Sequence, residues 1–327
     1  MMRAVIIGPG NIAKFHFEAF LRAGFKMEAV LSHPKSKSVK QFCLERKINK
    51  IYSSLRELID FQNLWDVLLI SCPTEKSLEY IKKLAPLKKP ILVEKPVSQR
   101  SKELKEITQY KNVMVGFNRR YYSTIELFKK FINKNDNVSL ALNIPESTDK
   151  LANGIEQFKR FPNEIYENSI HMFDILNYLV GTVNWTNTLT NKNKNRLFSV
   201  FAHGTSARNI TINLNINFNS PENYSITAYA NTQRAVLKPI EELKIYEGMK
   251  IIEPTDESPI RKFVPNMTEK YLVDTTDKLK PGFLEQALDF RLFCNSLKPN
   301  KAASLTDAFN ALKSIENIAE LLYYKEQ

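Results

Sequence analysis

The sequence predicts a two-domain protein of the α/β class. Residues 1–118 are predicted to form a doubly wound parallel sheet, and residues 119–327 an α+β domain with a large open, mostly antiparallel sheet. Three observations lead to this fold class. A chain of 327 residues is about twice the usual length of one domain. Its first third alternates short buried apolar runs with amphipathic segments, and period-two alternation follows beyond Asn137.

Composition restricts the partners that we expect. The share of hydrophobic residues is 43%, which is typical of a globular protein with a hydrophobic core. The formal net charge is +12. The lysines are scattered along helical surface stretches such as Lys82-Lys83 and Lys88-Lys89, without the arginine and aromatic clusters of an RNA-binding sheet. We therefore expect no nucleic-acid partner, and a positive field that favours anionic ligands.

Segments for targeting and residues for metal binding are scarce. Only four apolar residues stand between Arg3 and Gly8, and no later run approaches the ~18 apolar residues of a membrane span. Cys43, Cys72 and Cys294 form no C-x-x-C pair, and the chain has four histidines. We expect a cytoplasmic protein without membrane association, disulfides or a metal centre.

The first predicted strand, residues 4–7, runs into the turn Gly8-Pro9-Gly10-Asn11-Ile12-Ala13. Apolar residues then recur at spacings of three and four up to Ala23, which predicts a helix that Gly24 closes. In this context G-x-G-x-x-A is the fingerprint of a Rossmann dinucleotide site: Gly8 allows the tight turn and Gly10 the approach of a pyrophosphate. The residues expected to bind the cofactor phosphates are Gly8, Gly10, Asn11 and Ile12.

The second predicted strand, residues 27–31, ends without the acidic residue that would hold the ribose 2′-hydroxyl of NAD. The chain instead has Ser32 and His33, followed by Lys35 and Lys37. A hydroxyl, an imidazole and two ammonium groups suit a 2′-phosphate, so we favour NADP over NAD as cofactor. The alternative is that these are ordinary loop residues and that other groups hold the cofactor.

Further helices and strands alternate up to residue 115, as a doubly wound sheet requires. We predict helices at 36–46, 54–60, 75–84 and 101–109, and strands at 66–71, 91–93 and 113–115. Ligands of such sheets bind beyond the carboxyl ends of the strands. The residues at those ends are Gly8, Cys72, Pro73, Glu94, Lys95, Asn118, Arg119 and Arg120.

The second domain is predicted from its strands. Residues 209–218 alternate almost perfectly between apolar and polar side chains, which indicates a sheet with one apolar face. The other elements are strands at 138–144, 224–230 and 235–240, a helix at 164–180, a hairpin around Glu247-Gly248 and a surface connection at 253–281 that contains four prolines. Ser304 and Asp307 have the spacing of a capping box, which predicts the start of the last helix.

These motifs together resemble the glucose-fructose oxidoreductase / inositol dehydrogenase (Gfo/Idh/MocA) family. They are Gly8-x-Gly10-x-x-Ala13-x-x-His16, Glu94-Lys95-Pro96, Gly116-Phe117-Asn118-Arg119-Arg120, His171-x-x-Asp174 and Gly282-Phe283-x-x-Gln286. The resemblance implies an NAD(P)-dependent oxidoreductase that acts on the CH–OH group of a small-molecule sugar, cyclitol or nucleotide sugar. Family members often pair through the open sheet, which implies a homodimer or homotetramer.

The chemistry requires a proton acceptor and a group that stabilises an alkoxide. His171 can be the base, since an unperturbed histidine pKa of ~6.5 is close to the working pH. Glu167 and Asp174, four residues before and three after, can orient the imidazole. Lys95 can stabilise the alkoxide or share the proton, and the sequence leaves open which of Lys95 and His171 is the principal acceptor. The alternative for the histidine is a helix salt bridge.

The residues predicted to be catalytic are Lys95, His171 and Glu167. Other groups around them complete the predicted site. Besides the phosphate turn, the expected cofactor contacts are Ser32, His33, Cys72, Pro73, Glu94, Lys95 and Asn118. The expected substrate contacts are Lys95, Arg119, Asn168 and His171.

The chain departs from the family pattern at two positions. Glu167 stands where an aspartate is common, and Ser77 where a histidine is frequent. Two other functions remain open: an NAD-dependent glycosidase that works by transient oxidation, and a dinucleotide-binding regulator without turnover.

Overall fold

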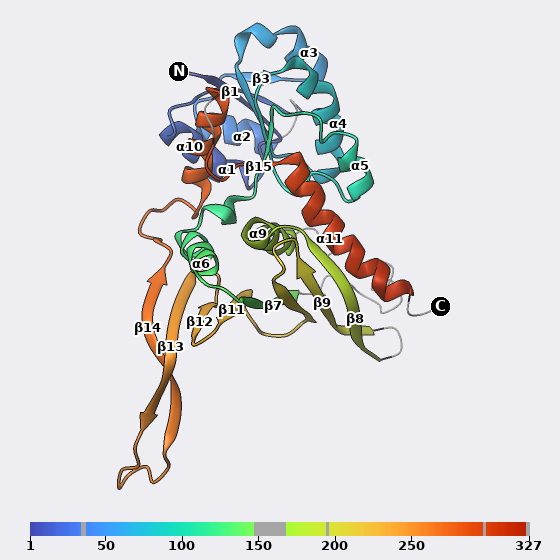
Figure 1. The fold of residues 1–327 in the computed structure, drawn as a ribbon. Helices are drawn as coiled ribbons and strands as arrows, with labels where there is room; N and C mark the ends of the chain where they lie inside the picture. Colours follow the sequence, from blue (N-terminus) through green and yellow to red (C-terminus); the bar gives the residue numbers. More distant parts are fainter. Residues whose placement is uncertain (34–36, 147–167, 194–195, 297–298, 325–327) are drawn as a thin grey trace. The chain divides into compact units, whose positions relative to one another are not determined.

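The computed structural model describes residues 1–327 except 34–36, 147–167, 194–195, 297–298 and 325–327; Figure 1 traces the chain. It divides into two compact units, Met1–Tyr121 with Asp274–Lys313, and Tyr122–Val273 with Ser314–Gln327. The sequence predicts one domain over 119–327, whereas residues 119–121 and 274–313 group with the first unit. Among the helices that the structure describes, none has both the length and the apolar character needed to span a bilayer.

The first unit is built on a seven-stranded sheet of order β15-β6-β5-β4-β1-β2-β3. All neighbours are parallel except β15, which is antiparallel to β6. This confirms the doubly wound sheet, and its order is that of a Rossmann fold with one added edge strand. The sequence prediction missed β3, because its three residues, Lys50-Ile51-Tyr52, lack the continuous apolar run that marks the equally short β5 and β6. The strands are β1 Arg3–Ile7, β2 Lys26–Leu31, β3 Lys50–Tyr52, β4 Val67–Ile70, β5 Ile91–Val93, β6 Val113–Val115 and β15 Ala303–Ser304.

Helix α10 (Phe283–Cys294) belongs to the first unit because its apolar side joins the core around α1 (Ala13–Arg22). The ring of Phe290 lies 5.7 Å from that of Phe20 and 5.9 Å from that of Phe25. Contacts between residues so far apart in sequence leave no local pattern from which the boundary could be predicted. The other helices of this unit are α2 Lys37–Glu45, α3 Leu55–Asp60, η1 Gln62–Leu64, α4 Thr74–Leu84, η2 Ala85–Leu87, α5 Ser101–Lys105 and η3 Asn118–Tyr121.

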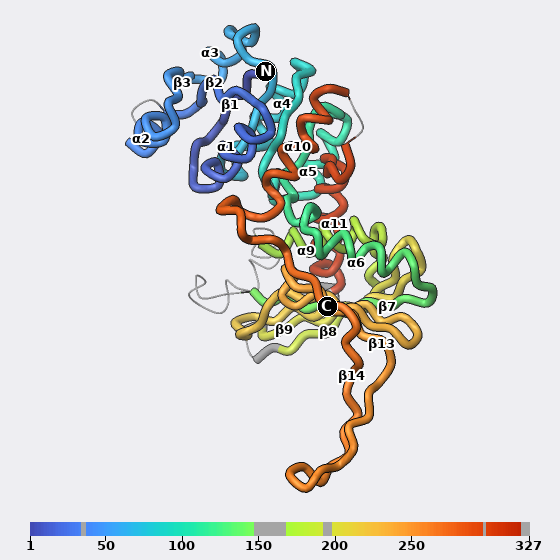
Figure 2. The backbone as a smooth tube through the Cα atoms, turned by 90° about the vertical axis from the view of Figure 1, so that its left-hand side faces the viewer, coloured from blue at the N-terminus to red at the C-terminus, as the bar shows by residue number. Residues whose placement is uncertain are grey.

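The second unit is built on an eight-stranded sheet of order β14-β13-β12-β11-β7-β10-β9-β8, in which only β7 and β10 are parallel neighbours. This confirms a large, mostly antiparallel sheet. Helices α6 (Ser123–Lys134) and α9 (Ile170–Val180) lie on one of its faces (Figures 1 and 2). The strands are β7 Ser139–Glu146, β8 Val183–Asn193, β9 Arg196–Ser206, β10 Thr211–Phe218, β11 Ser225–Ala230, β12 Gln233–Leu237, β13 Glu242–Ile252 and β14 Lys262–Leu272.

The hairpin predicted around Glu247-Gly248 is wrong, and so is the surface connection at 253–281. Gly248, at φ +64°, lies inside β13, where the register shifts between Tyr246 and Met249. Strand β14 pairs with β13 and occupies the middle of the predicted connection. The irregularity interrupts the period-two pattern, and a glycine within a strand imitates a turn signal.

The last helix, α11 (Leu305–Tyr324), begins with the predicted capping box. Ser304 Oγ accepts from Asp307 N at 3.2 Å, and Asp307 Oδ2 accepts from Ser304 N at 2.7 Å. The buried Arg120 guanidinium lies 3.3 Å from Asp307 Oδ1. Burial raises the pKa of the Asp307 carboxyl, but Arg120 and the bonds from Ser304 outweigh it and hold that pKa below its ordinary value.

A carboxyl whose pKa is lowered on folding stabilises the fold above its unfolded pKa, and this stabilisation is lost as the pH falls through the folded pKa. We therefore expect Asp307→Asn to lower the melting temperature by several degrees at about pH 7 and to have little effect at about pH 2. Thermal unfolding across this range checks it, with Asp60→Asn on α3 as the surface control. A melting difference that stays constant with pH would contradict the role given to the Asp307 charge.

Candidate active site

Five adjacent strands of the first unit carry predicted site residues at their carboxyl ends. In the sheet order β6-β5-β4-β1-β2, the residues that follow the strands are Asn118, Lys95, Cys72, Gly8 and Ser32. Each strand thus delivers one of them to the same edge of the sheet. This edge is where doubly wound sheets bind their ligands.

The glycine turn joins β1 to α1. Gly8 has φ +81°, a backbone conformation that residues with a side chain rarely adopt, and a Cβ on it would lie 2.7 Å from Cys72 Cα. Both the backbone conformation and the lack of space therefore require glycine here. A Cβ on the exposed Gly10 would meet nothing within 4 Å. Ile12 is the N-cap of α1, and no side chain of the described residues caps it. The first N–H groups of α1 are therefore available to an anion such as a phosphate.

A cavity of about 290 Å³ lies beside this turn. Lys14 supplies a cation and Ser38 a hydroxyl to its wall, and both escaped the sequence prediction. Lys14 follows Ala13 directly at the start of α1, so its position beside the glycine motif was the available signal. Ser32 is half-buried after β2 and His33 is exposed. The lining residues are Pro9, Gly10, Asn11, Lys14, Ser38, Gln41, Phe42 and Glu45.

The end of β5 carries Glu94 and Lys95, both half-buried. The Glu94 carboxylate accepts two hydrogen bonds, from His16 Nε2 through Oε1 at 2.6 Å and from Lys95 N through Oε2 at 3.2 Å. His16 comes from the first turns of α1 and is only 1% exposed. The structure therefore links the helix that follows the glycine turn to the segment that carries Lys95.

The C-terminal motif orders the segment after β6. The Gln286 side-chain oxygen, in the amide orientation that satisfies its neighbours, accepts from the backbone N–H groups of Phe117 and Asn118, each at 3.2 Å. Asn118 is buried and donates from Nδ2 to Pro281 O at 3.1 Å. Arg119 follows it, half-buried, in η3. Helix α10 thus fixes the backbone at Asn118, a predicted site residue, and at Phe117 directly before it.

Cys72 and Pro73 connect β4 to α4. Burial raises the pKa of the Cys72 thiol above its ordinary value, which keeps the group neutral and unreactive near neutral pH. Its Sγ lies 3.6 Å from the hydroxyl of Ser77. The serine that replaces the frequent histidine of the family pattern therefore packs against a predicted cofactor contact.

The second unit holds the other predicted residues. His171 and Asp174 lie on α9, 6% and 1% exposed, and Asn168 is exposed just before this helix. Glu167 falls outside the described residues. Lys95 and His171 therefore belong to different units.

The start of α9 is tied to the carboxyl end of β7. The hydroxyl of Ser169, two residues before His171, donates to Glu146 Oε1 and lies 3.4 Å from the hydroxyl of Tyr224. Glu146 escaped the sequence prediction, although it occupies the inward-facing register of Leu142 and Ile144, where a carboxylate is unexpected. Glu146 and Tyr224 line a cavity of about 530 Å³ together with Pro145, Asn219, Ser220, Pro221, Glu222 and Asn223.

Comparison with known proteins agrees with this architecture. Residues 2–118 match the family model described as "Oxidoreductase family, NAD-binding Rossmann fold" (Gfo/Idh/MocA). The uncharacterized oxidoreductase YrbE of Bacillus subtilis strain 168 is 28% identical over 182 residues, which cover 54% of this chain and 53% of that protein. The chain thus matches about half the length of this curated relative.

Two solved structures show the same fold over almost the whole chain. A dehydrogenase (MviM) from Clostridium difficile has a TM-score of 0.72 and 19% identity, with 98% of this chain and 99% of the other covered. Levoglucosan dehydrogenase in complex with NADH has a TM-score of 0.75 and 16% identity, with 99% and 97% covered.

The two glycines of the turn should respond differently to alanine. Gly8→Ala forces a side chain into the left-handed region and against Cys72, so we expect the melting temperature to fall by several degrees. Gly10→Ala meets no protein atom, so we expect normal melting but binding of NADH or NADPH weaker by at least about tenfold, because the methyl group blocks the pyrophosphate. Thermal unfolding and fluorescence titration with both dinucleotides check the two variants. Unchanged affinity of Gly10→Ala for the dinucleotide that the wild type binds more tightly would contradict the phosphate site.

Proposed function

We propose that this chain, whose residues 2–118 belong to the oxidoreductase family with an NAD-binding Rossmann fold, is an NAD(P)-dependent dehydrogenase. It transfers a hydride between the nicotinamide and a secondary alcohol or ketone of a sugar, cyclitol or nucleotide sugar. One observation carries the proposal: β1 and β5 flank β4 in the sheet, so an open, uncapped phosphate turn and Lys95 share one edge of the family-matched sheet. Phosphate binding and alkoxide stabilisation both require groups at this edge.

The residues divide the reaction between them. When bound, the oxidised nicotinamide accepts the hydride. Lys95 stabilises the alkoxide that develops as the hydroxyl loses its proton, and His171 accepts this proton. We assign the orientation of the imidazole to Asp174, buried three residues further along α9, and to Glu167. Asn118 contacts the cofactor, and Arg119 and Asn168 contact the substrate.

The cavity next to the start of α9 supports a substrate rich in hydroxyl groups. Its wall offers carboxylates, amides and hydroxyls from residues such as Glu146, Asn219 and Tyr224, which are the usual partners of sugar hydroxyls. Because Glu146 and Glu222 both line it, a neutral sugar or cyclitol fits better than the anionic part of a nucleotide sugar. Levoglucosan dehydrogenase, of similar fold, is named for a sugar derivative.

We favour NADP over NAD as the cofactor. The chain has no acid directly after β2, where Ser32 and His33 follow instead. Lys14 and Ser38 add a cation and a hydroxyl to the cavity beside the glycine turn, and both groups suit a 2′-phosphate. The Glu45 carboxylate on the same wall is paired with Arg46 at 2.9 Å, which offsets its charge.

A substrate screen tests the function and separates the alternatives. Sugars, cyclitols and nucleotide sugars are incubated with NAD and with NADP, and absorbance at the nicotinamide band is followed. A dehydrogenase changes this absorbance. A glycosidase that oxidises transiently cleaves its substrate without net change, and a regulator binds dinucleotide but turns over nothing. Either of the last two results would overturn the proposal.

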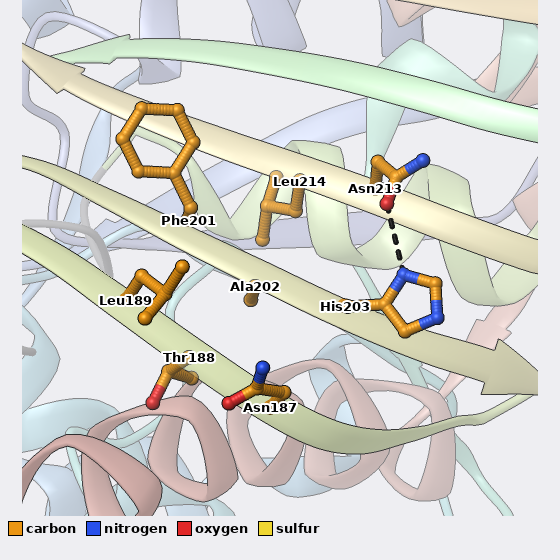
Figure 3. A pocket seen from close by; sticks show the side chains of 8 residues that line it. All are labelled: Asn187, Thr188, Leu189, Phe201, Ala202, His203, Asn213 and Leu214. Carbon is orange, nitrogen blue, oxygen red and sulfur yellow. Dashed lines mark hydrogen bonds between the residues drawn. The ribbon is translucent and has the colours of Figure 1, made fainter.

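The outer face of the second sheet supports self-association. Leu189 and Phe201 are 63% and 44% exposed there, beside a cavity of about 340 Å³ (Figure 3). His203 Nδ1 and Asn213 Oδ1, 2.9 Å apart, add polar groups to the same face. We propose that this face pairs with a second copy of the chain, in a homodimer or homotetramer.

Removal of the proposed catalytic groups should separate turnover from binding. We expect Lys95→Ala and His171→Ala to lower kcat by at least about 10³-fold while the Kd for the cofactor changes less than about threefold. Steady-state kinetics and fluorescence titration measure the two effects. Lys83→Ala, which removes an exposed lysine of α4, should leave both near wild type. Near-normal kcat in either test variant would refute the proposed chemistry.

Sedimentation equilibrium at micromolar concentration tests the pairing. We expect a mass that is a multiple of 37.8 kDa, and a shift toward the monomer in Leu189→Asp, because a buried unpaired carboxylate opposes association. Leu44→Asp, at an 82% exposed position on α2, is the matched control and should associate like the wild type. A monomeric wild-type protein would exclude the proposed pairing.

A further inference from the structure

The first unit buries a histidine–carboxylate pair that the mechanism above does not use. His16 Nε2 and Glu94 Oε1 are 2.6 Å apart, and the two side chains are 1% and 12% exposed. Burial of a carboxylate is costly unless strong donors satisfy it. A pair of apolar residues would fill such a position with similar or greater stability. The pair therefore requires an explanation other than the stability of the fold.

Both oxygens of the Glu94 carboxylate have a defined donor. Oε1 accepts from the imidazole of His16, and Oε2 accepts from the backbone N–H of Lys95 at 3.2 Å. The backbone of Glu94 is held in turn, since its N–H donates to Ile70 O at 2.8 Å. The carboxylate thus fixes the peptide from which the Lys95 side chain extends.

The residues packed around the His16–Glu94 pair fix the positions of both side chains. A Cβ on Gly116 would lie 3.1 Å from Glu94 Oε1, so the glycine provides the space that this oxygen occupies. The ring of Phe283 packs 4.7 Å from the His16 ring, and Phe20 approaches it edge-on at 6.4 Å. Two phenylalanine rings and a glycine from three separate segments therefore surround the pair and determine where the carboxylate lies.

We propose that Glu94 and His16 are positioning residues for Lys95. His16 holds the Glu94 carboxylate, and the carboxylate orients the Lys95 backbone so that the ammonium group meets the developing alkoxide. The inference rests on the proposed function of Lys95. A displacement of about 1 Å at a reacting group can reduce turnover by about 10²-fold without a comparable effect on binding.

Glu94→Gln tests the requirement for two acceptors at constant side-chain size. The amide has one oxygen, so it cannot accept from both donors: where its N–H group faces Lys95 N, two donors meet, and where it faces His16 Nε2, the imidazole must move its proton to Nδ1 to accept it. We expect kcat to fall by at least about tenfold, with KM and the cofactor Kd within about threefold of wild type. Glu79→Gln makes the same chemical change in an exposed pair with Lys83 on α4 and should leave kcat unchanged.

Variants of His16 test the donor. His16→Phe keeps a ring that packs on Phe283 but removes the N–H group, and should lower kcat as Glu94→Gln does. His16→Gln places an amide N–H near the position of the imidazole Nε2, and should recover several-fold more kcat than His16→Phe. Thermal unfolding identifies variants that fail to fold. Rescue by glutamine is not expected if the ring serves packing alone.

The outcomes separate this inference from the proposed function. Normal kcat in both Glu94→Gln and His16→Phe, with Lys95→Ala inactive, would overturn the positioning role and leave the function intact. An active Lys95→Ala would overturn the function itself. If no substrate is found, hydrogen exchange at the Lys95 backbone amide gives the test. Exchange should be at least about tenfold faster in His16→Phe than in the wild type, and in His16→Gln it should be slower than in His16→Phe. An unchanged rate in His16→Phe would refute the positioning role.

Discussion

A row of backbone hydrogen bonds runs across the carboxyl edge of the first sheet, and the candidate site depends on it. The N–H of the residue after each strand donates to the last carbonyl of the neighbouring strand: Gly8 to Leu31 at 3.2 Å, Ser71 to Ile7 at 2.8 Å, Glu94 to Ile70 at 2.8 Å and Gly116 to Val93 at 2.7 Å. The parallel register therefore extends one residue beyond the strands. Residues from five segments are aligned along one line before any side chain contributes.

This alignment brings backbones so close that side-chain size becomes critical. A Cβ at Gly8 would collide with Cys72 Cα, and a Cβ at Gly116 would press on the Glu94 carboxylate. The chain contains only nine glycines, and these two stand where neighbouring segments of the candidate site approach closely. From the C-terminal part, α10 adds Phe283 against His16 and Gln286 against the backbone after β6.

Local pattern predicted most of the first unit, because buried apolar runs and amphipathic helices each carry their own periodic signal. It failed where the determining contact is remote. Helix α10 joins the first unit through aromatic contacts with α1, and His16 contacts Glu94, which is 78 positions away in the sequence. The residues next to each of these contacts carry no pattern that predicts it. It also failed at Gly248, where a bulge has the composition of a turn. The inward register of Glu146 on β7 was visible in the alternation, but its partner Ser169 was not.

Each unit organises its part of the proposed chemistry with one largely buried carboxylate at or directly after the end of a strand. Glu94 accepts from the backbone of Lys95 in the first unit, and Glu146 accepts from Ser169, two residues before His171, in the second. Both carboxylates are held by bonds inside their own unit. The local geometry around Lys95 and around the start of α9 is therefore set by the fold before cofactor or substrate arrives. Groups fixed in advance in this way lose little free energy to reorganisation when charge develops on a substrate oxygen.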